Sequence, residues 1–134
     1  MQVKYLLDTN IVIYIQKHQP KSVLERFKTL EPGEAAISII TWGELLYGAE
    51  KSNRKKKVLE LLDEFSALVP VLAMPENAGQ NYAAIRAFLK SNGMPIGGND
   101  LWIAAHAKAE NLVLVTNNEK EFTRVPKLKV RNWI

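Results

Sequence analysis

Near the start of the chain, a short apolar run ends abruptly in three polar residues, and this junction constrains the fold more than any other stretch. The run spans 3–7 and is followed by Asp8, Thr9 and Asn10. Its strand-forming residues are typical of a strand buried on both faces. The apolar residues 11–15 come next, so any of the three polar residues is a candidate helix cap. In an open parallel α/β sheet such a corner lies at the carboxyl edge, where ligands bind. Asp8 is therefore either a helix cap or a site residue.

The rest of the chain alternates between strand-like and helix-like segments. Strands are expected at 35–40, 68–72, 112–116 and 128–134, and helices at 22–30, 41–52, 58–65, 75–91 and 100–109. Pro70 favours an edge position for the strand that contains it, and the last strand alternates like a second edge. We expect one domain over 1–134 with a three-layer α/β fold, in which helices flank a mainly parallel sheet of about four to five strands.

Composition excludes several classes of protein. The absence of cysteine rules out disulfides and thiolate metal sites, and two histidines far apart in the sequence, His18 and His106, argue against a zinc site. No apolar run approaches the ~20 residues that span a bilayer, and no basic-then-apolar leader precedes the first strand. We expect a cytoplasmic protein without membrane contact, in which oxygen atoms would hold any metal.

Positive charge is concentrated in two places. The net charge is +4, from 18 Lys and Arg against 14 Asp and Glu. The first basic cluster, a candidate nucleic-acid-binding surface, consists of Lys51, Arg54, Lys55, Lys56 and Lys57. The second consists of Lys120, Arg124, Lys127, Lys129 and Arg131. Either would attract a polyanion such as nucleic acid, and either is also compatible with a solvated helix face.

Three carboxylates occupy equivalent places in this scheme. Asp8 ends the first strand, Glu44 is expected on the first turn of the helix after the second strand, and Asp100 begins the helix before the strand at 112–116. All three positions lie at the carboxyl edge of a parallel sheet. Each also has a simpler role, because Thr41-x-x-Glu44 fits a capping box and Asp100 suits a helix dipole. Their shared location predicts an acidic site.

Clustered carboxylates repel one another unless a cation compensates them. Hard divalent ions such as Mg²⁺ or Mn²⁺ prefer oxygen ligands, and they can activate water and neutralise a leaving oxygen. With basic clusters in the same chain, the predicted chemistry is metal-assisted hydrolysis of phosphodiester bonds. The small polar residues expected to orient ligands or water are Thr9, Asn10, Ser38, Thr116 and Asn118.

Four segments resemble the PIN-domain family, and more closely the VapC toxins of toxin–antitoxin modules. They are Leu7–Asn10, Thr41–Ala49, Ile96–Ala105 and Val115–Phe122, which follow one another in the family's order along essentially the whole chain. The resemblance implies an endoribonuclease dependent on Mg²⁺ or Mn²⁺ that cuts structured RNA, often the anticodon loop of a tRNA, and so arrests translation. It implies that Asp8, Glu44 and Asp100 are the metal-binding catalytic acids.

The resemblance also implies partners. Such toxins form homodimers and are inhibited by a VapB-type antitoxin, which covers the active-site groove and itself binds operator DNA. In this chain, the helices at 11–15 and 58–65, with Leu45, Leu46 and Tyr47, are a candidate groove for an antitoxin helix. An antitoxin arginine that reached the three acids would displace the metal through charged hydrogen bonds.

The fourth acidic position of the family is where this chain departs from the pattern. Many PIN domains have an aspartate just after the last buried strand, where this sequence reads Thr116-Asn117-Asn118. We predict that Glu121, rather than Glu119, supplies this catalytic carboxylate from the next helical turn. Asn118-x-x-Glu121 also reads as a cap arrangement. If Asn118 is the ligand instead, a second metal would bind weakly.

Two other functions are compatible with parts of the sequence. A phosphatase that uses Asp8 as a nucleophile typically needs a second aspartate two residues on, where this chain has Asn10. A non-catalytic RNA-binding module would use the lysines for phosphate and the carboxylates only as caps. Three tryptophans could stack bases, but we expect core or dimer contacts for Trp42, Trp102 and Trp133.

Overall fold

A parallel sheet forms the centre of the computed structural model, which describes residues 2–134. Its strands are arranged in the order β3-β2-β1-β4-β5, and every neighbouring pair is parallel. Their bounds are β1 Tyr5–Leu7, β2 Ala35–Ser38, β3 Val71–Leu72, β4 Val113–Val115 and β5 Val130–Arg131. The predicted parallel α/β fold is confirmed, as are the two edge strands. The final strand is shorter than expected, since only two of the residues at 128–134 pair with β4.

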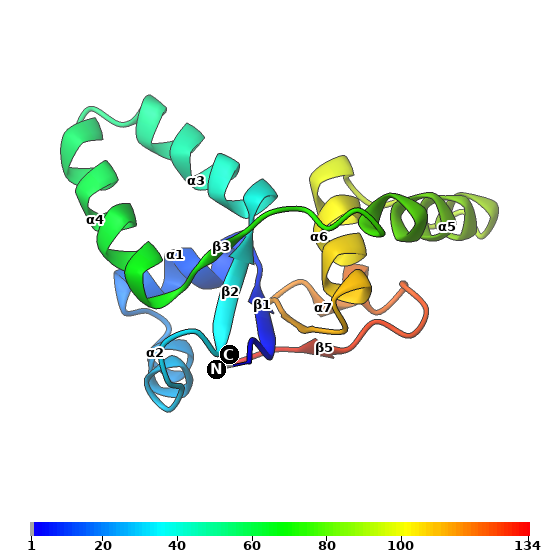
Figure 1. Ribbon diagram of the computed structural model, residues 1–134, viewed down its shortest axis with the longest axis horizontal. Helices are drawn as coiled ribbons and strands as arrows, with labels where there is room; N and C mark the ends of the chain where they lie inside the picture. The colour runs from blue at the N-terminus through cyan, green and yellow to red at the C-terminus, as the bar shows by residue number, and fades with distance from the viewer. Residues whose placement is uncertain (1) are drawn as a thin grey trace.

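Helices cover both faces of this sheet. Their bounds are α1 Thr9–Lys17, α2 Lys21–Lys28, α3 Ile39–Lys51, α4 Lys55–Leu68, α5 Ala78–Ser91, α6 Gly98–Ala109 and α7 Glu119–Phe122. In Figure 1, α1 to α4 lie on one side of the strands and α5 to α7 on the other. Within residues 2–134, none of these helices is long and apolar enough to cross a membrane.

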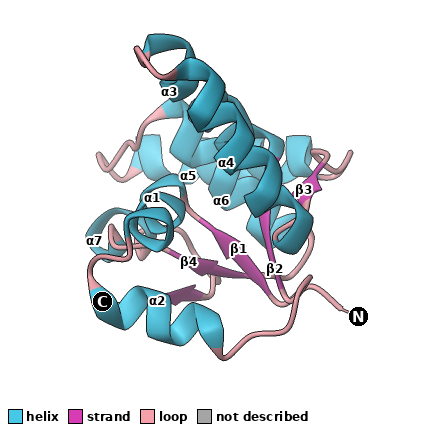
Figure 2. Cartoon of the chain, turned by 90° about the vertical axis from the view of Figure 1, so that its left-hand side faces the viewer, coloured by secondary structure: helices cyan, strands magenta, loops and turns pink. Residues whose placement is uncertain are grey.

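The two faces of the sheet carry separate apolar cores, because successive side chains of a strand point in opposite directions. In β1, Leu6 packs in the core under α5 and α6, whereas Leu7 packs in the core under α1, α3 and α4. Leu114 and Val115 of β4 divide in the same way, and all four side chains are fully buried. Figure 2 shows the strands enclosed between helices. This two-sided burial explains why the strand sequences are continuously apolar.

The order of the strands positions the site. From β1 the chain moves outward to β2 and then β3, and it returns to the opposite side of β1 for β4 and β5. The direction of winding therefore reverses between β1 and β4. In open α/β sheets, ligands bind at the carboxyl ends of the strands at such a reversal. Asp8 follows β1 and Thr116 follows β4, so both lie at this point.

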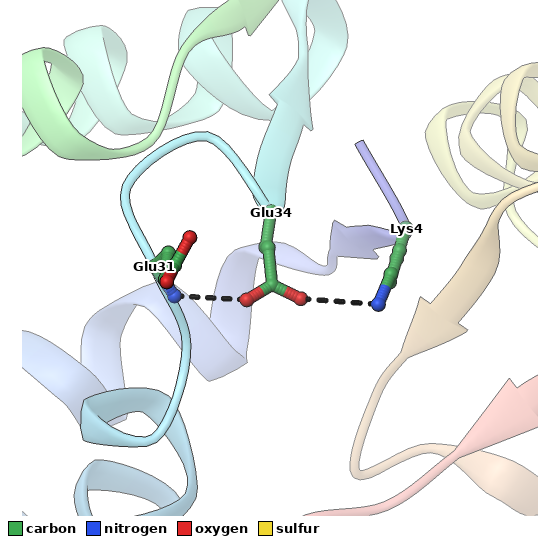
Figure 3. Close-up of polar contacts among 3 residues, drawn as sticks. All are labelled: Lys4, Glu31 and Glu34. Atoms are coloured by element: carbon green, nitrogen blue, oxygen red, sulfur yellow. Dashed lines mark hydrogen bonds and ion pairs between the residues drawn. The ribbon is translucent and has the colours of Figure 1, made fainter. Parts of the chain in front are cut away.

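At the opposite, amino edge of the sheet, polar contacts connect residues that precede two neighbouring strands (Figure 3). Glu34, just before β2, accepts a hydrogen bond from the backbone N–H of Glu31 at 2.9 Å and pairs with the Nζ of Lys4 at 3.5 Å. The Glu31 N–H, followed by the Lys4 charge, lowers the pKa of Glu34. These contacts join the loop before β2 to the start of β1.

The boundary between β2 and α3 differs from the sequence prediction. The helix begins at Ile39, two residues before the expected start at Thr41, and its N-cap is Ser38, whose Oγ accepts a hydrogen bond from the N–H of Ile40 at 3.1 Å. The proposed capping box of Thr41 and Glu44 is therefore wrong, and Glu44 lies on the second turn. Ile39 and Ile40 have the sequence character of a strand. They are nevertheless the first two residues of the helix, because Ser38 supplies its cap.

We expect Ser38→Ala to lower the free energy of unfolding by about 1 kcal/mol, because the cap to Ile40 is lost. The Ser38 side chain is fully buried, so water cannot replace the hydroxyl easily. Urea denaturation of both proteins measures the change. Ser66→Ala, which removes an exposed hydroxyl bond to the Asp63 carbonyl, is the control. Equal stability of Ser38→Ala and wild type would contradict the assigned cap.

Candidate active site

Asp8 joins the carboxyl ends of the two central strands. Its backbone N–H donates to the Val115 carbonyl at 2.9 Å, and its side chain is only 6% exposed. The Asp8 Oδ1 accepts from the Thr9 N–H at 2.8 Å, and Oδ2 accepts from the Thr116 hydroxyl at 2.9 Å. Asp8 is thus the N-cap of α1, as one reading of the sequence held. The same contacts fix the carboxylate at the point where winding reverses.

Glu44 is held by side chains from two other elements. The hydroxyl of Thr9 donates to Oε1 at 2.6 Å, and the amide of Asn99 donates to Oε2 at 3.4 Å. Thr9 also lies 3.4 Å from the buried hydroxyl of Thr41. Neither Thr41 nor Asn99 was predicted as a site residue. The only signals in the sequence were their places within the segments that hold Glu44 and Asp100.

Asp100 lies on the first turn of α6, half-buried, near the other acids. Burial, followed by the charges of Asp8, Glu121 and Glu44, raises the pKa of Asp100 to about 6. Burial also raises the pKa of Asp8, against the hydrogen bonds from Thr116 and Thr9, and Glu44 and Glu121 contribute in the same direction. The two aspartates therefore feel the charges of Glu44 and Glu121, as expected of four carboxylates that share one region.

The structure distinguishes the two glutamates of α7. Glu121 is partly buried, accepts a hydrogen bond from the side chain of Asn118, and raises the pKa of Asp8 and Asp100. Glu119 is exposed, and its Oε1 accepts from the Asn132 amide at 3.1 Å. Glu121 is therefore placed with the other acids. The bond joins the two side chains, so Asn118 does not cap α7 through its side chain, which was the alternative interpretation of this pair.

The small polar residues have different roles. Thr9 and Thr116 contact the acids directly, and the Thr116 hydroxyl also accepts from the Asn118 N–H at 3.0 Å. Ser38 is instead used as the cap of α3. Asn10 is exposed on the first turn of α1. The structure thus brings three of the five expected residues into contact with the acids or with their partners.

A divalent cation would suit this set of donors. Among residues 2–134, no lysine, arginine or histidine forms an ion pair with Asp8, Glu44, Asp100 or Glu121, so the chain itself does not compensate their charge. Their oxygen atoms are the ligands preferred by Mg²⁺. Across the same residues, no three acidic, histidine or cysteine side chains form a ready-made metal cage. Mg²⁺ does not need such a cage, because it keeps several of its waters when it is bound by carboxylates.

The first basic cluster surrounds the turn between α3 and α4, which projects away from the sheet in Figure 1. All five of its members are exposed, and the Nζ of Lys55 pairs with Glu50 at 2.7 Å. Lys51 is seven residues after Glu44, which is two helical turns or about 10 Å along α3. Lys51 alone therefore shares a helix with a site carboxylate.

Part of the predicted antitoxin groove is buried in the core, whereas Leu46 and Val58 are partly buried and Leu61 is exposed. Ile11, Leu45 and Leu62 are buried in the core under α1, α3 and α4, so they are not free to form a groove. Tyr47 is 63% exposed and remains available. Apolar periodicity could not separate side chains that face the sheet from those that face outward.

The tryptophans mostly have the structural role that we expected. Trp133 is buried with its ring edge-on to Tyr5, and Trp102 stacks on Tyr82 with ring centroids 4.0 Å apart. Trp42 is half-buried against the core under α1, α3 and α4.

In metal-free buffer, we expect Asp100→Asn to raise the free energy of unfolding at about pH 7.5 by roughly 1 kcal/mol. The folded pKa of Asp100 is about 6, above the ordinary 3.8, so the folded state binds its proton more tightly than the unfolded state. The contribution of Asp100 to stability therefore improves as pH falls through about 6, and the variant lacks this gain. Urea denaturation of the variant and the wild type at about pH 7.5 and about pH 5 measures the difference in stability. The control is Asp63→Asn, which changes an exposed aspartate. An unchanged pH dependence in Asp100→Asn would contradict the assignment.

The chain is similar to known proteins over nearly its whole length. Residues 5–128 match the model of the PIN domain. The chain is 42% identical over 132 residues to Ribonuclease VapC2 of Haemophilus influenzae, covering 98% of this chain and 99% of that protein. It is 42% identical over 131 residues to the tRNA(fMet)-specific endonuclease VapC of Shigella flexneri, covering 98% of each. The crystal structure of VapBC2 from Rickettsia felis bound to a promoter DNA fragment superposes with a TM-score of 0.90 at 39% identity, over 100% of both chains.

Proposed function

This chain belongs to the PIN-domain family and, within it, to the VapC-type toxin endoribonucleases, and on this premise we propose that its acidic cluster cuts RNA with a divalent metal ion. The ion is Mg²⁺ or Mn²⁺, and its protein ligands are Asp8, Glu44 and Asp100. Glu121 is the fourth carboxylate of the site. The observation that carries the proposal is a group of acids in which the pKa values of Asp8 and Asp100 are raised and which has no cationic partner among residues 2–134.

The protein's own residues hold the reacting groups in place. Both oxygens of Asp8 accept hydrogen bonds from the chain, and so do both oxygens of Glu44, so neither carboxylate rotates freely. Thr9 contributes to both, through its N–H and its hydroxyl. A bound divalent ion supplies a more acidic water as nucleophile and offsets negative charge on the phosphate. Fixed ligands of this kind lower the cost of reaching the reactive arrangement.

The proposed substrate is tRNA. Two relatives about 40% identical, from Shigella flexneri and Salmonella typhimurium, are named tRNA(fMet)-specific endonucleases. The exposed lysines and arginines of this chain supply the positive charge that an RNA backbone requires. Cleavage in the anticodon loop, with arrest of translation, is the expected outcome.

The proposed partner is a VapB-type antitoxin. Solved structures at 39–40% identity include VapBC complexes from Rickettsia felis, Salmonella typhimurium and Haemophilus influenzae, two of them bound to DNA. We propose that this chain forms a homodimer, is inhibited by its antitoxin, and reaches operator DNA only through it.

Cleavage of a total small-RNA pool by the purified chain tests the proposal. We expect discrete products with Mg²⁺ or Mn²⁺ and none after the metal is removed with a chelator, and sequencing of the products would identify the target. Restoration of cleavage by added Mg²⁺ is the control for irreversible damage by the chelator. Binding of RNA without cleavage under any divalent ion would favour the non-catalytic RNA-binding module.

A further inference from the structure

A hollow on the outer side of α3 lies directly against Glu44. Its volume is about 360 Å³, and it is shallow and open to solvent. It is lined by Ile39, Ile40, Gly43, Glu44, Tyr47 and Asn99. Two of these residues, Glu44 and Asn99, are already joined by a hydrogen bond in the acidic site. The hollow therefore borders the acidic site at Glu44 and Asn99.

The backbone of Gly43 borders open space in this hollow. A Cβ atom added at Gly43 would meet nothing within 4 Å. Ile39 and Tyr47, four residues before and after it, lie on the same side of the helix and are 43% and 63% exposed. Large apolar side chains with this exposure on both sides of a glycine are not used by the core of the fold. They form the walls of a site that is open to a ligand.

Lys51 places a positive charge beside the aromatic wall. Its Nζ lies 4.6 Å from the centroid of the Tyr47 ring. The spacing of seven residues puts Lys51 on the same side of α3 as Glu44. Lys55, by contrast, is paired with Glu50. The site thus combines an exposed aromatic ring with a lysine, next to a carboxylate of the acidic cluster.

We infer that this hollow, the Tyr47 hollow, binds one unpaired nucleobase of the RNA next to the cleaved bond, with Tyr47 stacking on the base and Lys51 binding an adjacent phosphate. Aromatic stacking together with lysine contacts to the backbone is the usual way to hold single-stranded RNA. The inference rests on the proposed ribonuclease activity and adds the position of the substrate strand. It predicts that the RNA follows α3 away from the acids, toward Lys51.

The test measures RNA binding separately from cleavage. In an Asp8→Asn background, which prevents cutting, binding of a fluorescein-labelled single-stranded RNA oligonucleotide of mixed sequence is followed by anisotropy. We expect Tyr47→Ala to weaken binding about tenfold and Tyr47→Phe by less than about twofold, because phenylalanine keeps the ring. Phe88→Ala, on α5 across the sheet, removes another exposed aromatic ring and is expected to change nothing.

Lys51 and Gly43 give two further readouts. Lys51→Gln should reduce the slope of log affinity against log salt by about 0.7, the value for one phosphate contact to a single strand, whereas Tyr47→Ala should leave the slope unchanged.

Gly43→Leu should fill the Tyr47 hollow and weaken binding about tenfold or more, without lowering the melting temperature, since leucine is a better helix former than glycine.

The outcomes separate this inference from the proposed function. If the wild type cuts RNA but Tyr47→Ala and Gly43→Leu bind like their parent, the inference is overturned and the ribonuclease stands. If the wild type cuts nothing but binding still depends on Tyr47, the ribonuclease proposal fails and the binding site stands. If Tyr47→Ala changes the oligomeric state in sedimentation, the hollow is an interface between copies, and the inference is also overturned.

Discussion

Replacing Asp8 by asparagine is expected to lower RNA cleavage by roughly 10³-fold or more while the fold is retained. Asparagine keeps an oxygen that can accept the hydrogen bond from the Thr9 N–H, so the cap of α1 survives. The variant removes a buried charge whose ionised form is already disfavoured, as the raised pKa of Asp8 shows. The effect should therefore fall on metal binding and cleavage, with stability unchanged or higher. Single-turnover cleavage and urea denaturation of the same preparation measure both.

The control for this substitution is Glu60→Gln, which removes an exposed carboxylate from α4 without touching the site. It should cut RNA at the wild-type rate. If Asp8→Asn retains cleavage within about tenfold of wild type, Asp8 is a helix cap only. Loss of cleavage together with a large loss of stability would also contradict the prediction, because the asparagine would then have failed as a structural replacement.

Much of this architecture could be predicted from the apolar patterns. Continuous apolar strands separated by helical segments require a sheet covered on both faces, and the structure has one. The start of α3 could not be predicted, since Ser38 and Thr41 are both capable caps and Ile39 and Ile40 are good strand residues. The local preferences for strand and for helix are therefore nearly equal at Ile39 and Ile40. The hydrogen bond from the Ile40 N–H to the Ser38 hydroxyl forms only in the folded chain.

The site was predictable where topology alone decided it. Asp8, Glu44 and Asp100 are brought together because each lies beside the carboxyl end of a parallel strand. The contacts that orient them were not predictable, because Thr9 and Glu44 are 35 residues apart and Asn99 and Glu44 are 55 apart. Charge clustering was a weaker guide, since it could not show that most of the first basic cluster lies at the far end of α3.

We expect His106→Leu to raise the free energy of unfolding by about 1–3 kcal/mol near neutral pH. His106 is fully buried on α6, beside the equally buried Ala104, Ala105 and Ala107. Neither of its ring nitrogens has a hydrogen-bond partner among residues 2–134. Burial of unpaired polar atoms costs stability, and leucine fills a similar volume without them. A less stable variant would mean that an ordered water satisfies the ring.

The same substitution should change how stability depends on pH. Burial lowers the pKa of His106 below the ordinary 6.5, against a smaller opposing effect of Glu110, so the unfolded state binds the proton more tightly. The contribution of His106 to stability therefore falls as pH drops below about 6.5, which is opposite in sign to that of Asp100. In metal-free buffer, His106→Leu should gain stability relative to wild type between about pH 7.5 and pH 5, and Asp100→Asn should lose it. The matched control is His18→Asn, which changes an exposed histidine whose left-handed backbone asparagine tolerates. Parallel pH curves for His106→Leu and wild type would show that His106 takes up its proton equally well in the folded and unfolded states.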